Sequence, residues 1–112
     1  MQSQQLDIMF HALSDPYRRT LVEKLSRGPA SVTELAGSVP LAMPSVVKHL
    51  QVLEGGGIVR STKAGRVRTY GMRPDGLNAI GEWVRQREAT MNRAFDRLAQ
   101  AMIDVPERRD EQ

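Results

Sequence analysis

The residues best suited to chemistry lie on one side of a helix predicted over residues 44–54. Four of them share the spacing i, i+3, i+4 and i+7 of a single helix side: Pro44, Val47, Lys48 and Gln51. The lysine and the glutamine carry donors that reach base edges or phosphates, and the proline and valine offer apolar surface that suits a thymine methyl group. Ser45 lies at the edge of this side. The mixture predicts a DNA-contacting surface, since a major groove admits an α-helix.

The opposite side of the same helix is apolar. Val46, Leu50 and Leu53 recur at i, i+4 and i+7 and are expected in the core. Pro44 suits the first helical turn, where its missing N–H is not needed. The glycines at 55–57 supply the free backbone conformations of a helix end. One side is therefore predicted to anchor the helix while the other faces outward.

A shorter helix precedes it across a tight turn. Ser31 and Glu34 form the S-x-x-E pattern of a capping box, which predicts a helix from there to about Ser38. Pro40 ends it, because proline cannot continue a helix and disfavours helical geometry in the residue before it. Two helices joined by a short turn, the second with a mixed exposed side, are typical of a helix-turn-helix.

After this motif, residues 58–72 change to a β pattern around a turn at 63–66, which predicts a hairpin, or wing. The second strand is expected to alternate through Val67, Thr69 and Gly71. Lys63, Arg66 and Arg68 are predicted to contact phosphate or the minor groove. The alternative is a charged hairpin edge that prevents strand aggregation, and both interpretations can hold at once.

Two helices are predicted before the helix-turn-helix, over residues 6–13 and 16–26. The second is expected to have Asp15 as its N-cap and Pro16 at its first position. Its core-facing residues are predicted to be Leu21, Val22 and Leu25.

Three polar residues have two interpretations each. Arg18 and Arg19 either hold a phosphate at a helix start or make ordinary surface pairs, such as Arg19 with Glu23. His49 is expected to be a packed, hydrogen-bonded residue or a backbone contact rather than a metal ligand.

The last predicted element is one helix from about Leu77 to Ile103, about 40 Å long. The short helices of one small domain cannot cover its apolar stripe, and solvating the stripe would cost about 25 cal/mol per Å². We therefore predict a homodimer in which this helix and the first helix pack against their copies. The predicted interface residues are Leu6, Phe10, Leu77, Ile80, Val84, Met91, Phe95 and Leu98. The alternative is a helix folded back onto its own domain or broken near Gly81.

Trp83, Met91 and Met102 on this helix are most simply dimer core. Alternatively they line a pocket for a small-molecule effector, because flexible methionine suits adaptable sites. The fold class predicted by all these elements is mainly α with a small β-hairpin, a winged helix-turn-helix with helical dimerisation ends.

Composition sets outer limits on this interpretation. The 112 residues suit one domain, predicted over 1–103, followed by a charged tail at 104–112 that is expected to be disordered. The net charge of +3 favours an anionic partner, and Glu54 is the only acid between Lys48 and Arg73. Cysteine is absent, which excludes disulfides and thiolate metal sites. No apolar run approaches the roughly 18 residues of a membrane span, so a cytoplasmic protein without a membrane partner is expected.

Three runs resemble, in their order and spacing, the ArsR (SmtB/ArsR) family of bacterial winged-helix transcription regulators. They are LSDPYRRTLVEKLSRGPASVTELA, PSVVKHLQVLEGGGIV and GRVRTYGM. The resemblance covers about Phe10 to Trp83, most of the chain. It implies a homodimeric repressor that binds a palindromic double-stranded DNA operator and is released by a signal.

The metal sites of that family are not matched. The arsenic-type site is a Cys-Val-Cys run, and the matching residues are Ser31, Val32 and Thr33. The zinc-type site uses Asp and His pairs on the last helix, but no histidine follows His49. The chain therefore resembles the non-metal subgroup, with no metal and no cofactor expected. Ala42 also stands at the predicted N-cap where this family often has Ser, and such a replacement typically costs about 1 kcal/mol.

Two other classes of function were compared with DNA binding. A winged-helix protein-interaction module that does not bind DNA is supported by the apolar Met43, Pro44 and Val47. An enzyme is the least supported class. The chain has no Cys and two separated His, and no carboxylate pair stands in an apolar pocket of the kind that acid–base catalysis needs.

Overall fold

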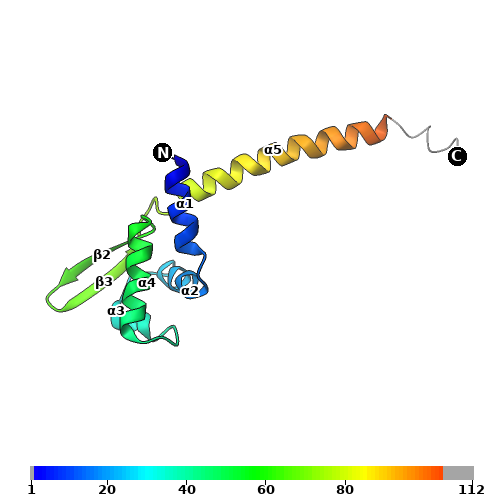
Figure 1. Cartoon of the computed structure of the whole chain (residues 1–112). Coiled ribbons are helices and arrows are strands. Elements are labelled where there is room, and N and C mark those ends of the chain that lie inside the picture. Colours follow the sequence, from blue (N-terminus) through cyan, green and yellow to red (C-terminus); the bar gives the residue numbers. More distant parts are fainter. Residues whose placement is uncertain (1, 105–112) are drawn as a thin grey trace. The chain divides into compact units, whose positions relative to one another are not determined.

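The computed structural model describes residues 2–104 (Figure 1). These divide into two compact units, one up to Ile80 and one from Gly81, and each is described by itself. The elements in chain order are α1 (Gln2–Leu13), α2 (Pro16–Leu25), β1 (Ala30–Ser31), α3 (Val32–Ala36), α4 (Met43–Gly55), β2 (Val59–Ala64), β3 (Val67–Met72) and α5 (Asn78–Ile103). The prediction of a mainly helical chain with a β-hairpin is confirmed. Helix α1 begins earlier than expected, and α3 ends before Ser38.

Helix α4 lies at the centre of the first unit, where it packs against α1, α2, α3 and β2 (Figure 1). Val46, Leu50 and Leu53 on its inner side are completely buried, as predicted. Three completely buried residues outside α4 share the same core: Leu21, Leu35 and Ile58. Because truncating a buried leucine to alanine costs about 2–5 kcal/mol, this packing fixes which side of α4 faces outward.

The sheet has three antiparallel strands in the order β1-β3-β2, so the predicted hairpin gains a third strand. Strand β1 pairs Ala30 with Tyr70 and Ser31 with Thr69. Two residues are too short for any periodicity, and Ser31 also serves as the N-cap of α3. Sequence patterning therefore missed this strand.

The hairpin differs from the prediction in two details. Its loop is only Gly65 and Arg66, because Lys63 and Ala64 still pair with β3. Gly65 has φ +62° and no non-glycine residue described has positive φ, which is the arrangement of a type II′ turn. The buried residue of β3 is Tyr70, which belongs to the opposite face from the predicted alternation through Val67, Thr69 and Gly71. Of that set, Val67 is the most open, at 54% exposed.

The predicted N-caps of α2 and α3 are confirmed. The Asp15 carboxylate accepts from the N–H groups of Tyr17 and Arg18, at 2.8 and 3.1 Å. Ser31 Oγ accepts from the Glu34 N–H at 3.1 Å, and Glu34 Oε1 accepts from the Ser31 N–H at 2.8 Å, which is a capping box. Helix α4 has Ala42 at its N-cap and no side-chain cap bond, as its sequence predicted.

These caps lower the pKa of both carboxyl groups. Desolvation raises the pKa of Asp15, but the N–H bonds from Arg18 and Tyr17 and smaller charge effects outweigh it. For Glu34 the Ser31 N–H is the largest cause of the lowered pKa, followed by the Ser31 hydroxyl. Both groups stay ionised at neutral pH, where negative charge suits the positive end of a helix.

Arg18 is buried, which corrects the prediction of a surface or phosphate-binding residue. Its Nε donates to the Ala12 carbonyl at 2.7 Å and its Nη2 to the His11 carbonyl at 3.0 Å. Carbonyls in the last turn of a helix have no partner within it, and a cation is favourable there. Arg18 therefore caps the C-terminal end of α1. Beside it, Arg19 Nη1 donates to the Leu13 carbonyl at 2.7 Å.

The third contact of Arg18 reaches α4. Its Nη1 lies 3.1 Å from Nδ1 of His49, and the Tyr17 ring lies 6.3 Å from the imidazole, tilted by 47°. The prediction that His49 is packed and hydrogen-bonded is confirmed. One guanidinium thus joins the end of α1, the start of α2 and the middle of α4.

Helix α5 is one uninterrupted helix of 26 residues, about 39 Å long. The predicted single last helix is confirmed, and the alternative of a break near Gly81 is wrong, because Gly81 lies within the helix. No residue of α5 is buried. Near its start the Arg87 guanidinium lies 5.3 Å from the Trp83 ring centre, a cation–π contact. Of the predicted tail, 105–112 lie outside the described residues.

Arg18→Met should lower the free energy of unfolding by about 2–4 kcal/mol. The apolar stem is kept, but the buried Ala12 carbonyl and His49 Nδ1 lose their donor, whereas the His11 carbonyl keeps its bonds from Ser14. Urea denaturation measures the change. Arg19→Met removes a donor from an exposed neighbour and is expected to cost less than about 1 kcal/mol. Equal losses for the two variants would contradict the assignment of Arg18 as a structural joint.

Glu34→Gln should make stability less dependent on pH in the acid range. A carboxylate with a lowered pKa stabilises the fold above its unfolded pKa, and this contribution is lost as the pH falls through the folded pKa. Wild type should therefore exceed Glu34→Gln at about pH 7, and the two should converge towards about pH 3. Urea midpoints across this range test it, with Glu23→Gln as an exposed control. A gap that persists at the acid end would be inconsistent with the capping carboxylate.

Candidate nucleic-acid interface

The residues predicted to face a groove lie on the outer side of α4. Pro44, Ser45, Lys48 and Gln51 are exposed, and Val47 is half-buried. Because α4 is anchored through its buried inner side, these five side chains are held in a fixed direction relative to the domain core.

The basic residues of the wing lie across a hollow from this side of α4. The hollow has a volume of about 480 Å³ and is lined by Val32, Val47, Gln51, Glu54, Lys63, Arg66, Arg68 and Tyr70. It brings five of the eight predicted DNA contacts together: Val47, Gln51, Lys63, Arg66 and Arg68. The other three, Pro44, Ser45 and Lys48, lie on α4 outside its lining.

Glu54 and Ser61 form a brace between α4 and the wing that the sequence analysis missed. Ser61 Oγ lies 3.3 and 3.1 Å from the two Glu54 carboxylate oxygens, to which it donates. Arg68 Nη1 donates to the same Ser61 oxygen at 2.9 Å. Ser61 pairs with Tyr70 across the hairpin, so Arg68 is its diagonal neighbour. The charge pattern held a signal for this brace, because Glu54 is the only acid in a basic stretch.

In this brace Arg68 contacts Ser61, in addition to its predicted contact with DNA. A guanidinium has five N–H donors, so Arg68 can hold Ser61 through Nη1 and present the others to a phosphate. Arg66 and Lys63 are exposed near the tip of the hairpin, with Arg66 in the two-residue loop itself.

The buried Tyr70 also lines this hollow. Burial is the largest cause that raises the pKa of its phenol, and the Glu54 carboxylate raises it further. The phenol therefore stays neutral across the physiological range, and the face between α4 and the wing keeps its positive charges without an added anion.

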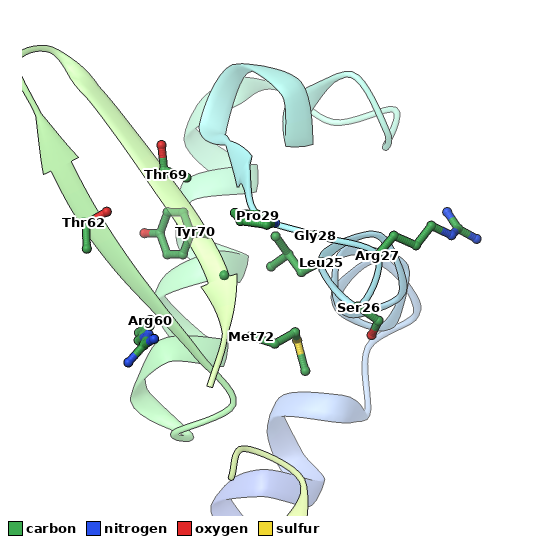
Figure 2. Close-up of a pocket in the computed structure, with 11 residues that line it drawn as sticks. Leu25, Ser26, Arg27, Gly28, Pro29, Arg60, Thr62, Thr69, Tyr70 and Met72 are labelled. Atoms are coloured by element: carbon green, nitrogen blue, oxygen red, sulfur yellow. The ribbon is translucent and has the colours of Figure 1, made fainter. Parts of the chain in front are cut away.

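A second hollow, of about 450 Å³, lies between the end of α2 and the sheet (Figure 2). Figure 2 shows Leu25, Pro29 and Met72 grouped between these elements, with Thr62 and Thr69 on the strands and Arg27 pointing away. Its lining contains no carboxylate and no imidazole. This hollow therefore offers no acid–base pair for catalysis.

The residues that match the family's arsenic-type metal site belong to the start of α3 in this structure. Ser31 caps α3, and Val32 and Thr33 lie in its first turn. Within residues 2–104, no three His, Asp or Glu side chains gather closely enough to hold a metal ion. The absence of a metal site stays a prediction.

The residues predicted for a dimer interface divide by element. In α1, Leu6 is half-buried and Phe10 is exposed. Of the later residues, Ile80 is half-buried, and the exposed ones are Leu77, Val84, Met91, Phe95 and Leu98. None of the described helices combines the length and apolar character of a bilayer-spanning segment.

Comparison with known proteins agrees with this geometry. Residues 13–62, which run from the end of α1 into β2, match a family described as a helix-turn-helix domain. The HTH-type transcriptional regulator Rv2034 of Mycobacterium tuberculosis is 42% identical over 74 residues, which are 66% of this chain and 69% of Rv2034. The transcriptional repressor SdpR of Bacillus subtilis is 25% identical over 76 residues, covering 68% of this chain and 84% of SdpR.

A solved structure extends the likeness to the fold. The crystal structure of the ArsR family transcriptional regulator RHA00566 aligns with a TM-score of 0.76 at 40% identity. The alignment covers 80% of this chain and 93% of that one. With the helix-turn-helix, the wing and this degree of identity in agreement, the chain belongs to the ArsR family of transcriptional regulators.

Proposed function

We propose that the chain is a homodimeric repressor that binds a palindromic DNA operator. In this proposal α4 enters the major groove and the wing rests on the backbone or in the minor groove. The observation that carries it is the single face on which the outer side of α4 meets the basic hairpin across one hollow.

The side chains of α4 divide the recognition between them. Lys48 and Gln51 are exposed and can donate to base edges or phosphates. Pro44 and Val47 present apolar surface to thymine methyl groups, and Ser45 can contact either kind of group.

The wing supplies contacts that do not depend on sequence. Lys63 and Arg66 are exposed near its tip and suit phosphate oxygens or a narrow minor groove. The Glu54–Ser61–Arg68 brace supports the wing from α4, so the two contact regions keep a fixed separation. A fixed separation favours binding across one groove and its neighbouring backbone.

The homodimer is supported by apolar surface that a single chain leaves exposed. On α5, Phe95 and Leu98 are 57% and 58% exposed, and Met91 is 51% exposed. They recur at helical spacing with Val84 and Met102, so they form one stripe. A second copy can cover such a stripe through a self-complementary two-fold interface. Leu6 and Phe10 of α1 complete the proposed interface.

The repressor role draws support from SdpR, which is itself a transcriptional repressor. Two-fold symmetry in the protein corresponds to an inverted repeat in the operator, with half-sites about one helical turn apart or a multiple of it.

Selection of bound sequences from random duplexes by the purified chain tests the proposal. The expected outcome is an inverted repeat whose affinity falls steeply with salt, because phosphate contacts release counterions. Recovery of no enriched sequence would contradict it. That result would favour the second candidate, a protein-interaction module, for which the exposed Met43 beside Pro44 is the supporting observation.

Lys48→Ala and Arg66→Ala should have different effects on binding. Lys48→Ala removes a groove donor and should cost about 1–3 kcal/mol on the selected duplex, with a smaller loss on a scrambled one. Arg66→Ala removes a phosphate contact and should weaken binding to both duplexes and reduce the salt dependence. Fluorescence anisotropy at several salt concentrations measures both.

The matched control for this pair is Arg27→Ala, which removes an exposed charge that lies on neither α4 nor the wing. Its effect should be small and equal on both duplexes. Equal losses for Lys48→Ala on selected and scrambled duplexes would remove the groove role of Lys48.

Phe95→Glu should dissociate the proposed dimer, because it places a charge within the apolar stripe of α5. Light scattering after size exclusion at micromolar concentration should then give the mass of one chain. Ala89→Glu adds the same charge on the opposite side of α5 and should leave the dimer intact. A wild-type chain that is already monomeric, or two variants that behave alike, would contradict the assigned interface.

A further inference from the structure

We propose that His49 is a positioning residue for DNA recognition, which holds α4 in place only while its imidazole is neutral. Acidification should therefore weaken sequence-specific DNA binding. This inference rests on the proposed DNA-binding function and adds to it a regulated joint behind the recognition surface.

The protonation state of His49 follows from its partner. Arg18 Nη1 lies 3.1 Å from His49 Nδ1, and a guanidinium has only donors and does not lose its proton in proteins. Nδ1 must therefore be the acceptor in this bond. An imidazole that accepts at Nδ1 is neutral and carries its proton on Nε2.

Arg18 cannot move away to accommodate a charged imidazole. Its Nε and Nη2 are held by the Ala12 and His11 carbonyls at 2.7 and 3.0 Å, and the side chain is only 9% exposed. Protonation of His49 would place an N–H against another N–H and one positive charge against another at short range. The bond between α2 and α4 would then be lost, because Arg18 is held by its two carbonyl partners.

The loss would act on the proposed DNA contacts through α4 itself. His49 follows Lys48 and lies two residues before Gln51, so all three share one turn of α4. Within the described residues, the hydrogen bond from Arg18 to His49 is the polar side-chain contact between this turn of α4 and α2. Releasing it would leave this turn of α4 held to α2 by apolar packing, with the Glu54–Ser61 contact remaining nearer the C-terminal end of the helix. Sequence-specific contacts depend on the rotation of α4 about its own axis more than phosphate contacts do.

The other charged groups around His49 do not replace this contact. The Asp15 carboxylate interacts electrostatically with His49 and opposes Arg18, but it is fixed by its cap bonds to Tyr17 and Arg18. The Tyr17 ring is the aromatic neighbour of the imidazole. From α3, Glu34 is held in its capping box, and from β2, Lys63 lines the hollow on the outer side of α4.

In α1, helical spacing places Asp7 and the side chain of His11 away from the buried Met9 and Ala12, and both are exposed. Arg18 is thus the charged group in direct contact with His49. Histidine is the side chain whose charge ordinarily changes between about pH 5 and 8, which sets the pH range of the test.

The predicted sign is opposite to the usual one. Protonating a histidine near DNA adds positive charge and ordinarily strengthens binding, since phosphate contacts dominate affinity. A loss of affinity on acidification that is specific to the selected sequence therefore separates a positioning role from general electrostatics.

The test measures affinity of the full chain for the selected duplex and for a scrambled one, at about pH 7.5 and about pH 5.5. Wild type should lose about tenfold in affinity for the selected duplex, which is within the usual range of coupling between two sites. The scrambled duplex should show no loss. Circular dichroism should show the same helix content at both pH values.

Two variants isolate the imidazole. His49→Asn places a carboxamide oxygen at the position of Nδ1, so it still accepts from Arg18 but does not titrate; its affinity should change less than about twofold with pH. His11→Gln removes the other histidine of the chain and should keep the wild-type loss. Ring nitrogen NMR shifts of the wild type give a test without variants, with Nε2 protonated and Nδ1 unprotonated at about pH 7.5.

Several results would overturn the inference while leaving DNA binding intact. They are wild-type affinity that holds or rises on acidification, the same pH dependence in His49→Asn as in wild type, and a neutral imidazole with its proton on Nδ1. A wild-type chain that binds no duplex at about pH 7.5 would instead contradict the proposed function, and the inference with it.

Discussion

Helix α4 packs into the core along one side and faces solvent along the other, and the rest of the first unit is arranged around this constraint. Its inner side is completely buried at Val46, Leu50 and Leu53, so a large rotation of the helix would open the core. A helix seated by one apolar stripe necessarily turns its other side outward. The polar and apolar residues of that outer side therefore owe their fixed direction to residues that can never touch a ligand.

The same helix is held by polar contacts at its middle and near its C-terminal end. Arg18 joins its middle to α1 and α2 through His49, although no carboxylate neutralises the buried guanidinium directly. The carbonyls at the end of α1 take that role, because the C-terminal end of a helix carries partial negative charge. Towards its C-terminus, Glu54 holds the wing through Ser61 and Arg68. Hydrogen bonds are directional, so these contacts define an orientation that apolar packing alone would leave less specific.

Much of this fold could be predicted from local sequence rules. The capping box at Ser31 and Glu34, the N-cap at Asp15 and the stripe on α4 each follow from the geometry of one helix. Arg18 shows where such rules fail. It occupies the first position of the i, i+3, i+4, i+7 stripe that continues with the buried Leu21, Val22 and Leu25. Its charge suggested a surface residue, whereas its position in the stripe indicated burial.

Features that depend on pairing between distant segments were harder to predict from the sequence. Strand β1 exists because Ala30 and Ser31 pair with β3. A two-residue sequence has no pattern from which this pairing could be predicted. The brace from Glu54 to Arg68 required the hairpin register, which places Ser61 diagonal to Arg68. The alternation through Val67, Thr69 and Gly71 did not indicate that Tyr70, on the other face of β3, is the buried residue of this strand. Tertiary packing, rather than strand propensity, decides such cases.

The central claim is that the outer side of α4 and the tip of the wing form one DNA-binding face. Amide chemical shifts recorded while the isotope-labelled chain is titrated with its selected duplex test this most directly. The largest changes should fall in the first turns of α4 and around Gly65 at the wing tip, with little change in the second unit beyond Gly81. Changes confined to α5, or a spectrum unaltered by DNA at low salt, would contradict it.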